Sequence, residues 1–229
     1  MAPIYAKVGG VRIRPIVLTA AAAALLIAGC GDANQSNTEP VAQGGTVSCQ
    51  YPADGSPARP VDAPPTENVP ATGEVAVTLH LTAGDVNITM DREKAPCTVN
   101  SFVSLTEQGY FDDTVCHRLT DTGIFVLQCG DPTATGTGGP GYTISDEVTD
   151  DLTYPTGTVA MAKRQPPNTG GSQFFLVWAD TDLPPEYTVF GQMDQAGIDV
   201  VGGIAAQGVD GTDGQSPNAE AKITNVTLG

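Results

Sequence analysis

Glycine and proline constrain the fold of this chain more than any other residue type, because its 229 residues include 27 glycines and 18 prolines. Both residues are common in turns, and neither is well tolerated inside a helix. The composition therefore favours a turn-rich, strand-rich body over a helical bundle. The length fits one domain with additional tails.

The charge of the chain limits its partners. Ten Lys and Arg residues oppose 26 Asp and Glu residues, which gives a formal net charge of -16. Nucleic-acid binding needs clustered cations that neutralise phosphates, so no nucleic-acid partner is expected. A hydrophobic content of 40% also argues against several membrane spans. We interpret the acidic surface as a feature that maintains solubility.

Residues 1–29 have the pattern of an export signal. Lys7, Arg12 and Arg14 form a positive region, and an apolar run of thirteen residues follows at 16–28. This run suits a signal peptide and is shorter than the roughly 20 residues that span a bilayer. The chain is therefore expected to be exported.

The apolar run ends in Ile27-Ala28-Gly29-Cys30, which resembles a bacterial lipobox. Acylation of Cys30 would hold the protein on the extracytoplasmic face of the cell membrane. The alternative is an ordinary secretory signal with an incidental cysteine.

A proline-rich tether is predicted at 30–73. Residues 31–73 contain seven prolines and no Leu, Ile, Phe, Met or Trp, so they offer little apolar area to offset the entropy of ordering. The segment Cys49-Gln50-Tyr51 is the exception, because a disulfide there would attach part of the tether to the domain. The folded domain is expected at 74–229.

From Glu74 the pattern becomes that of strands. Apolar residues alternate over 75–81 and again over 86–90 around Ala83-Gly84-Asp85, which predicts a hairpin. Pro96 and Gly109 fit the start and stop of a helix. A second helix is expected over about 196–206, and further strands at 115–119, 124–129, 158–162, 172–177, 188–192 and 223–228. Many strands with two helices favour a closed or nearly closed antiparallel barrel whose ends are covered by helices.

Four cysteines follow Cys30, namely Cys49, Cys97, Cys116 and Cys129. An even number in an exported chain predicts disulfides, and three pairings are possible. The chain has no Cys-x-x-Cys spacing and only two histidines, so no metal site is expected.

Two motifs have simpler explanations than the chemistry they resemble. Residues 136–141 match a GxGxxG pattern, but Pro140 and the strand-like residues after it disfavour the helix that a dinucleotide site requires. Ser172 lacks the second glycine of a nucleophile elbow. Neither phosphate binding nor serine hydrolysis is expected.

A different chemistry is indicated by Arg118, Gln128 and Gln173, which lie in strand-like segments beside large apolar residues. Such residues would make a shallow apolar groove with a few hydrogen-bond donors. Without an activated nucleophile or a metal, this groove suits binding and conformational chemistry better than bond cleavage.

The chain resembles the cyclophilins, the cyclophilin-type peptidyl-prolyl cis-trans isomerases, over 74–229. The resemblance is carried by motifs at 116–118, 128–132, 136–141, 167–175 and 188–191. It implies a mainly β fold, a closed eight-stranded antiparallel barrel capped by two helices. The cysteine positions resemble an exported bacterial branch, and this resemblance implies pairing of Cys116 with Cys129 and of Cys49 with Cys97.

The resemblance also implies a mechanism centred on Arg118. Rotation about an X-Pro bond faces a barrier of roughly 18–20 kcal/mol. In the twisted state the prolyl nitrogen gains a lone pair, which an arginine can stabilise more than it stabilises the planar amide. No cofactor is required.

By the same resemblance, other residues hold the peptide. Those expected to grip the proline ring are Phe125, Val126, Phe175 and Leu183, and those expected to hold the flanking peptide are Gln128, Gln173 and the backbone at Ala162 and Lys163. Three positions depart from the family pattern: Lys163 replaces a common asparagine, Tyr187 replaces a common histidine, and a tryptophan is missing beside Leu183.

Two functions are therefore considered. The first is a prolyl isomerase, expected to be monomeric, that acts on proline-containing peptides and unfolded exported proteins. The second is a tethered prolyl-peptide binding module or chaperone with little turnover. Retention of the Arg118 and Gln128 motifs favours the first.

Overall fold

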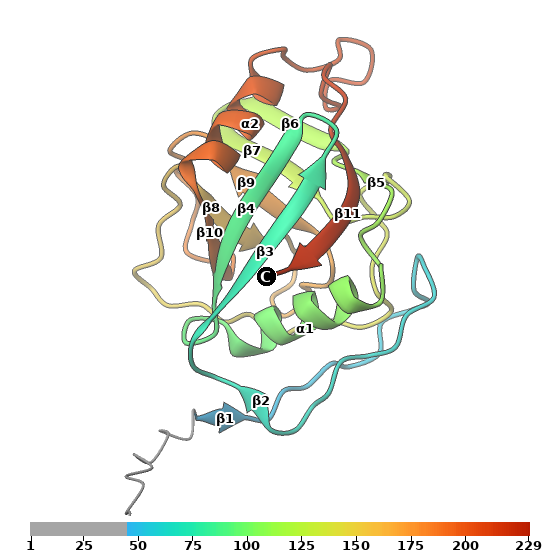
Figure 1. The fold of residues 1–229 in the computed structure, drawn as a ribbon, viewed down its shortest axis with the longest axis vertical. Helices are drawn as coiled ribbons and strands as arrows, with labels where there is room; N and C mark the ends of the chain where they lie inside the picture. Colours follow the sequence, from blue (N-terminus) through green and yellow to red (C-terminus); the bar gives the residue numbers. More distant parts are fainter. Residues whose placement is uncertain (1–44) are drawn as a thin grey trace, which may run out of the picture. The chain divides into compact units, whose positions relative to one another are not determined.

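The computed structural model describes residues 45–229, most of which form one curled antiparallel sheet with two helices (Figure 1). The helices are α1 (Pro96–Glu107) and α2 (Gln195–Ala205). A separate pair of short strands consists of β1 (Thr46–Val47) and β2 (Val69–Pro70). The strands of the main sheet are β3 (Glu74–Leu81), β4 (Gly84–Asp91), β5 (Thr114–Val115), β6 (Arg118–Thr122), β7 (Ile124–Cys129), β8 (Thr158–Met161), β9 (Phe174–Val177), β10 (Val189–Met193) and β11 (Lys222–Leu228).

The strand order of the main sheet is β5-β11-β3-β4-β10-β8-β9-β7-β6. The two edge strands are β5 and β6, and only Cys116 and His117 separate them in the sequence. The sheet therefore curls until its two edges lie near each other. The prediction of a mainly β barrel-like fold with two helices is confirmed, but the strand count and the closure differ. Nine strands replace the expected eight because the strand predicted at 115–119 is interrupted at Cys116 and His117.

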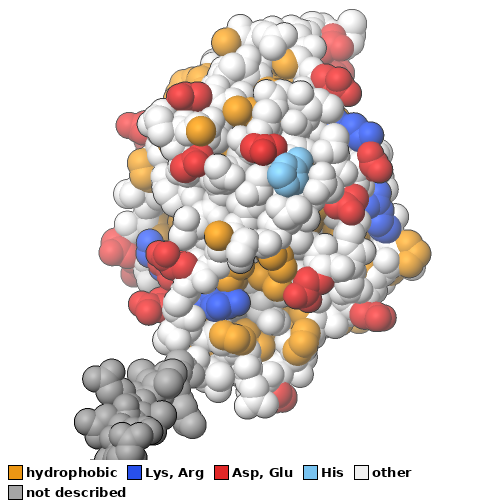
Figure 2. Space-filling model, in the orientation of Figure 1, with side chains coloured by type: hydrophobic (Ala, Val, Ile, Leu, Met, Phe, Trp, Pro, Cys, Tyr) orange, Lys and Arg blue, Asp and Glu red, His pale blue; other side chains and the backbone are white. Residues whose placement is uncertain are grey.

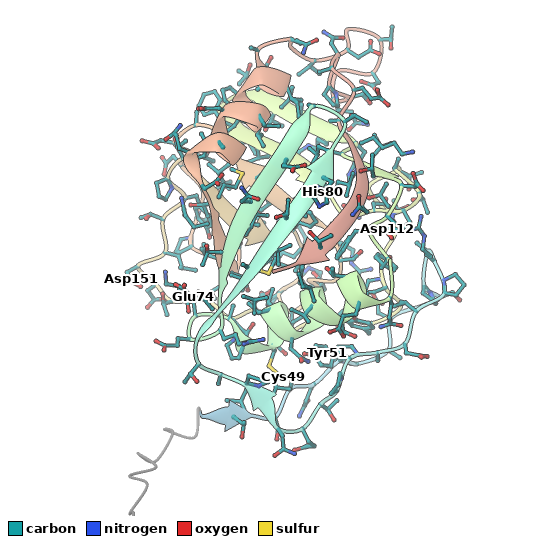
Figure 3. All side chains as sticks on the ribbon, in the orientation of Figure 1. Cys49, Tyr51, Glu74, His80, Asp112 and Asp151 are labelled. Carbon is teal, nitrogen blue, oxygen red and sulfur yellow. A yellow bond between two sulfur atoms is a disulfide. The ribbon has the colours of Figure 1, made fainter. Side chains whose placement is uncertain are left out.

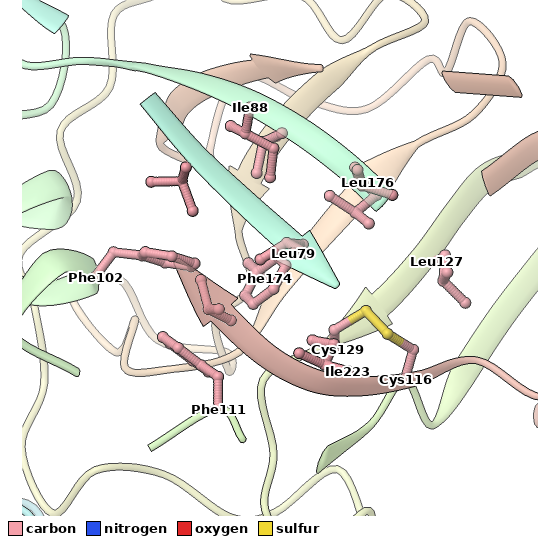
Figure 4. Packing of buried hydrophobic residues seen from close by; sticks show 14 of the residues in the cluster. Leu79, Ile88, Phe102, Phe111, Cys116, Leu127, Cys129, Phe174, Leu176 and Ile223 are labelled. Atoms are coloured by element: carbon pink, nitrogen blue, oxygen red, sulfur yellow. A yellow bond between two sulfur atoms is a disulfide. The ribbon is translucent and has the colours of Figure 1, made fainter. Parts of the chain in front are cut away.

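The apolar residues that alternate in the first hairpin form part of the core. In β3 and β4, Leu79 and Val86 are paired and fully buried, and Ile88 and Met90 point to the same interior. Figure 4 shows Phe102 and Phe174 packed there with Phe111. The ring centroids of Phe102 and Phe111 lie 4.7 Å apart, and those of Phe102 and Phe174 lie 5.3 Å apart. Burial of these large side chains is the main source of stability.

Each helix has an identifiable start. Pro96 occupies the first turn of α1, where its missing N–H costs no hydrogen bond. Helix α2 is capped by Asp194, whose Oδ1 accepts a hydrogen bond from Gly197 N at 2.7 Å. The predicted range of α2 differs from the observed one by a single residue at each end. Figure 1 shows α1 at the lower end of the sheet and α2 near its upper end.

The described part of the predicted tether, residues 45–73, is ordered, and we call it the arm. The arm runs beneath α1 (Figures 1 and 3) and is attached to it by the Cys49–Cys97 disulfide. Arg59 Nη1 donates to the carbonyl oxygens of Gly109, Tyr110 and Asp112 at 2.9, 3.0 and 2.6 Å. Tyr51 and Val61 also pack against the core, so the arm is ordered by a covalent bond, hydrogen bonds and a small amount of apolar contact.

Both disulfide pairings implied by the resemblance are present. Cys49 and Cys97 have Cα atoms 5.5 Å apart, and those of Cys116 and Cys129 are 4.0 Å apart. The Cys116–Cys129 bond lies in the core beside Ile223 (Figure 4). One bond therefore fixes the arm and the other joins the start of β6 to the end of β7.

The predicted signal peptide, the lipidation site Cys30 and the first part of the predicted tether lie outside the described residues. Within residues 45–229, no helix has the length and apolar character needed to cross a membrane. Acidic side chains are scattered over the face shown in Figure 2.

Candidate functional site

A row of side chains crosses the outer face of the sheet, opposite the core. Arg118 of β6 pairs with Gln128 of β7, which pairs with Phe175 of β9, which pairs with Ala160 of β8. Directly paired residues share a face of a sheet, and successive residues alternate between faces. The neighbours of this row therefore point into the core, as the buried Leu119, Leu127, Phe174 and Leu176 show.

Phe175 is the centre of an apolar patch on this outer face. Its buried neighbours are Val126, Tyr154, Ala160 and Val177, and the partly buried Leu183 and Tyr187 pack around them. The ring of Tyr187 contacts that of Phe175 edge-on, with centroids 5.5 Å apart. Tyr154 fixes the Tyr187 segment, because Tyr187 N donates to Tyr154 Oη at 3.0 Å. The patch is a rigid apolar surface separate from the barrel core.

Arg118 lies beside the patch and is held by a chain of side-chain amides. Arg118 Nη1 donates to Gln128 Oε1 at 3.1 Å, and Gln128 Nε2 donates to Gln173 Oε1 at 2.8 Å. Gln173 Nε2 in turn donates to Gly138 O at 2.9 Å. Among residues 45–229, no carboxylate forms an ion pair with Arg118. The half-buried guanidinium therefore keeps N–H donors that no carboxylate neutralises.

His117 does not add a second positive charge to the site. Its ring is 8% exposed, and neither ring nitrogen has a hydrogen-bond partner among the described residues. Burial, with a smaller contribution from the charge of Arg118, lowers the pKa of His117 below its usual range, although Asp131 opposes this shift. The imidazole is therefore neutral at neutral pH, and the positive charge next to the patch is that of Arg118.

Asp131 organises the glycine-rich loop at 130–141. Its fully buried carboxylate accepts hydrogen bonds from the backbone N–H groups of Thr133, Gly136 and Gly138 at 2.7, 2.8 and 3.0 Å. Burial alone would raise the pKa of Asp131, but the hydrogen bond from the Thr133 hydroxyl and these backbone hydrogen bonds together lower it below its usual range. An ionised carboxylate thus holds the loop, and the loop holds Gln173 through Gly138.

A cavity of about 580 Å³ lies on the other side of the glutamines. Its lining includes Gln128, Gln173, Ala162 and Lys163, together with the glycine-rich loop. The opposite wall consists of arm residues 54–56. We call this space the arm cavity. Its lining combines polar and apolar groups, whereas the patch around Phe175 is apolar.

The backbone of Lys163 was predicted to hold the flanking peptide, and its side chain is held by an ion pair. Lys163 Nζ forms an ion pair with Asp146 Oδ2 at 2.9 Å, and both side chains are almost buried, at 10% and 12% exposed. The ammonium also lies 5.9 Å from the centre of the Tyr187 ring. The residue that replaces a common asparagine therefore helps to hold the wall shared by the patch and the arm cavity.

The predicted site residues thus fall into two adjoining groups, with one exception. Val126, Phe175, Leu183 and Tyr187 form the patch, and Gln128, Gln173, Ala162 and Lys163 line the arm cavity. Arg118 joins the two groups through Gln128.

Phe125 is the exception. Alternation along β7 places it on the face opposite to Val126 and Gln128, and its ring packs edge-on against Trp178 with centroids 5.1 Å apart. The structure therefore does not place the Phe125 ring with that of Phe175, contrary to the expectation drawn from the resemblance.

Sequence reasoning also missed Asp131 and the arm as parts of the site. Asp131 stands inside the motif at 128–132, and an acidic residue directly before a glycine-rich loop was the signal available. The arm gave no comparable signal, because its role depends on contacts with residues far away in the chain.

Comparisons with known proteins agree with this geometry. A family model described as cyclophilin type peptidyl-prolyl cis-trans isomerase/CLD matches residues 76–228. The probable peptidyl-prolyl cis-trans isomerase B of Mycobacterium tuberculosis is 44% identical over 199 residues, which cover 80% of this chain and 64% of the relative. The corresponding Mycobacterium leprae protein is 43% identical over 198 residues, covering 80% of this chain and 67% of the relative. The match with the M. tuberculosis protein thus spans slightly less than two thirds of its length.

Solved structures are similar as well. A Cryptosporidium parvum cyclophilin-type peptidyl-prolyl cis-trans isomerase superposes with a TM-score of 0.61 at 28% sequence identity, covering 69% of this chain and 98% of that one. The same protein, solved in the presence of the dipeptide Ala-Pro, gives a TM-score of 0.60 at 29% identity, covering 67% and 98%.

Proposed function

Because the chain belongs to the cyclophilin-type peptidyl-prolyl cis-trans isomerase family, we propose that it accelerates rotation about X-Pro bonds. The observation that carries this proposal is the position of Arg118. Its guanidinium has no carboxylate partner among the described residues and lies in the same outward-facing row as Phe175. A proline ring seated on the apolar patch would have its imide nitrogen next to this donor.

The mechanism follows from the difference between the planar and the twisted imide. In the planar state the prolyl nitrogen shares its lone pair with the carbonyl group and accepts hydrogen bonds poorly. Rotation localises that lone pair, so a hydrogen bond from Arg118 stabilises the twisted state more than the ground state. The reaction makes and breaks no covalent bond.

One hydrogen bond does not supply the whole acceleration. A rate increase of 10⁵ corresponds to about 7 kcal/mol, whereas a hydrogen bond to a charged group contributes roughly 1.5–3 kcal/mol. We propose that the patch around Phe175 holds the proline ring while Gln128 and Gln173 hold the flanking peptide. With both sides anchored, the bound peptide is kept close to the twisted geometry.

The test is an isomerisation assay on a short Ala-Pro peptide with the purified full chain. Accelerated cis-to-trans conversion that saturates with peptide concentration would support the proposal. An uncatalysed rate despite measurable peptide binding would favour the alternative, a prolyl-peptide binding module or chaperone. The Phe125 ring gives that alternative its basis, because it packs against Trp178 and leaves the patch with one aromatic ring fewer than expected.

We further propose that the protein assists the folding of exported proteins while anchored through Cys30 to the outer face of the cell membrane. Two disulfides among the described residues suit an oxidising compartment. Slow X-Pro isomerisation limits the folding of many chains, so an isomerase is useful there. Cell fractionation tests the anchor: Cys30→Ala should move the protein from the membrane to the soluble fraction, and no change would contradict lipid anchoring.

A further inference from the structure

The arm closes one side of the arm cavity. Its residues 54–56 line this space together with Gln128 and Gln173. Gln128 belongs to the row that contains Arg118 and Phe175, and it donates a hydrogen bond to Gln173. The cavity is therefore continuous with the surface on which the proline is proposed to bind. A peptide extending from the patch must pass over it.

The arm is fixed where it forms this wall. Asp54 N donates to Gly141 O and Ala58 N donates to Gly139 O, both at 2.8 Å. Thr143 N donates to Pro52 O at 2.9 Å. Gly141 has a φ of +83°, and a Cβ at this position would lie 3.0 Å from Pro57. The close approach of arm and loop thus needs a glycine at 141, so the wall is a built feature of the site.

An ion pair joins two exposed side chains of the cavity lining. Arg164 Nη2 donates to Asp54 Oδ2, and both residues line the cavity from opposite sides. The side chains are 63% and 43% exposed. An exposed ion pair of this kind contributes little to stability and is readily broken. The two side chains can therefore separate, which would widen the space between them.

The distance from the patch indicates which peptide residue meets the cavity. Gln173 precedes Phe175 by two positions, which corresponds to roughly 7 Å in extended chain. A peptide residue two positions from the proline covers a similar distance. Its side chain would therefore lie above the arm cavity when the proline ring lies on Phe175.

We propose that the arm is a specificity-determining element, which limits the side chain two positions from the proline to slender, hydrogen-bonding residues. This inference rests on the proposed function, because it assumes that the peptide is anchored by its proline. The walls explain the preference: glycine backbone, Ser56, Thr137 and Thr143 offer polar groups, whereas the arm and the Asp54–Arg164 pair restrict the width. A bulky aromatic side chain would have to displace them.

The experiment compares peptides that carry Ala, Gln or Trp two positions before or after proline. Catalytic efficiency and calorimetric affinity are measured with the full chain and with two variants. Ser56→Trp fills the cavity and should lower the preference for the Gln peptide over the Ala peptide about tenfold. Asp54→Ala removes the ion pair with Arg164 and should raise efficiency or affinity for the Trp peptide at least threefold relative to the Ala peptide. Ser48→Trp, at an exposed arm position outside the cavity, is the matched control.

The outcomes separate this inference from the proposed function. If no peptide is isomerised but Ser56→Trp still changes the binding preference, the function fails and the specificity role stands. If peptides are isomerised and the preference is the same in wild type, Ser56→Trp and Asp54→Ala, the specificity role is wrong and the function stands. An equal change for all peptides, or the same change with Ser48→Trp, would also contradict the inference.

Discussion

The two sides of the site are built by different means. The apolar patch stands on β7, β8 and β9, where ladder pairs place Phe175 next to Gln128 and Ala160. The arm cavity is enclosed by loops and the arm, whose positions depend on a buried carboxylate, a disulfide and backbone hydrogen bonds. The first side thus depends on strand pairing, and the second on bonds between distant segments.

This difference shows how one surface can keep its catalytic residues fixed while the residues that set peptide preference change. A sheet face is stiff, because its side chains are fixed by both neighbouring strands and by the core beneath them. A wall made of loops and an arm can change in sequence without disturbing the sheet. We therefore expect changes in the patch and its arginine to affect turnover, and changes around the cavity to affect stability and preference.

Arg118→Ala should produce the largest effect on the patch side. Loss of a donor that acts mainly in the twisted state should lower kcat roughly 100-fold, with a much smaller change in KM. Steady-state isomerisation of an Ala-Pro peptide measures both constants, and Arg92→Ala is the control. Equal losses in turnover and peptide affinity would contradict the differential role of Arg118.

Asp131→Asn should produce the largest effect on the cavity side. It replaces a buried anion that accepts several backbone hydrogen bonds, and its expected cost in free energy of unfolding is about 2 kcal/mol. Urea unfolding measures this cost, with the exposed Asp121→Asn as the control.

The Asp131 carboxylate also makes the stability of the protein depend on pH. In the unfolded chain an Asp carboxyl titrates near pH ~3.9, and its pKa is lower in the folded protein. The stabilisation is therefore complete above this pH and is lost as the pH falls through the folded pKa. Wild type should lose more stability than Asp131→Asn below about pH 4, and parallel stability curves for the two proteins would contradict this assignment.

Phe174→Leu and Phe175→Leu test the two faces of one strand. Phe174 points into the core, so its replacement should lower the free energy of unfolding by about 1 kcal/mol and leave catalysis nearly intact. Phe175 points into the patch, so its replacement should lower kcat/KM several-fold at a smaller cost in stability. Thermal unfolding and the peptide assay, applied to both variants, give a direct comparison. A reversed pattern would show that the patch does not hold the proline.

His117 should give the smallest effect. Its folded-state pKa is lowered by burial, whereas in the unfolded chain it titrates near the ordinary value of about 6.5. As pH falls below that value, the unfolded chain binds a proton that the folded protein resists, so stability decreases. Wild type should therefore lose more stability between pH 7 and pH 5 than His117→Phe, as measured by urea unfolding. Identical slopes would show that His117 is protonated in the fold.

The sequence alone predicted the elements on which the patch stands. Period-two alternation identified the strands that become β3 and β4, because such a pattern reflects which face each residue takes. The strands predicted at 124–129, 158–162 and 172–177 become β7, β8 and β9. The resemblance added Arg118, Gln128 and Phe175, which the strand register brings into one row. The resemblance assigned both Phe125 and Val126 to the pocket, whereas the structure places them on opposite faces of β7 and packs Phe125 against Trp178.

The tertiary structure decided what local patterns do not encode. The composition of the arm predicted a tether, since it offers little apolar area, yet hydrogen bonds to residues about 50 to 90 positions away and the bond to Cys97 order it. The sequence fixes which groups are present, but hydrogen bonds between distant segments form only when the barrel has brought the partners together. The half of the site built on the sheet therefore follows from strands that the local sequence predicts, and the half enclosed by loops and the arm follows from the completed fold.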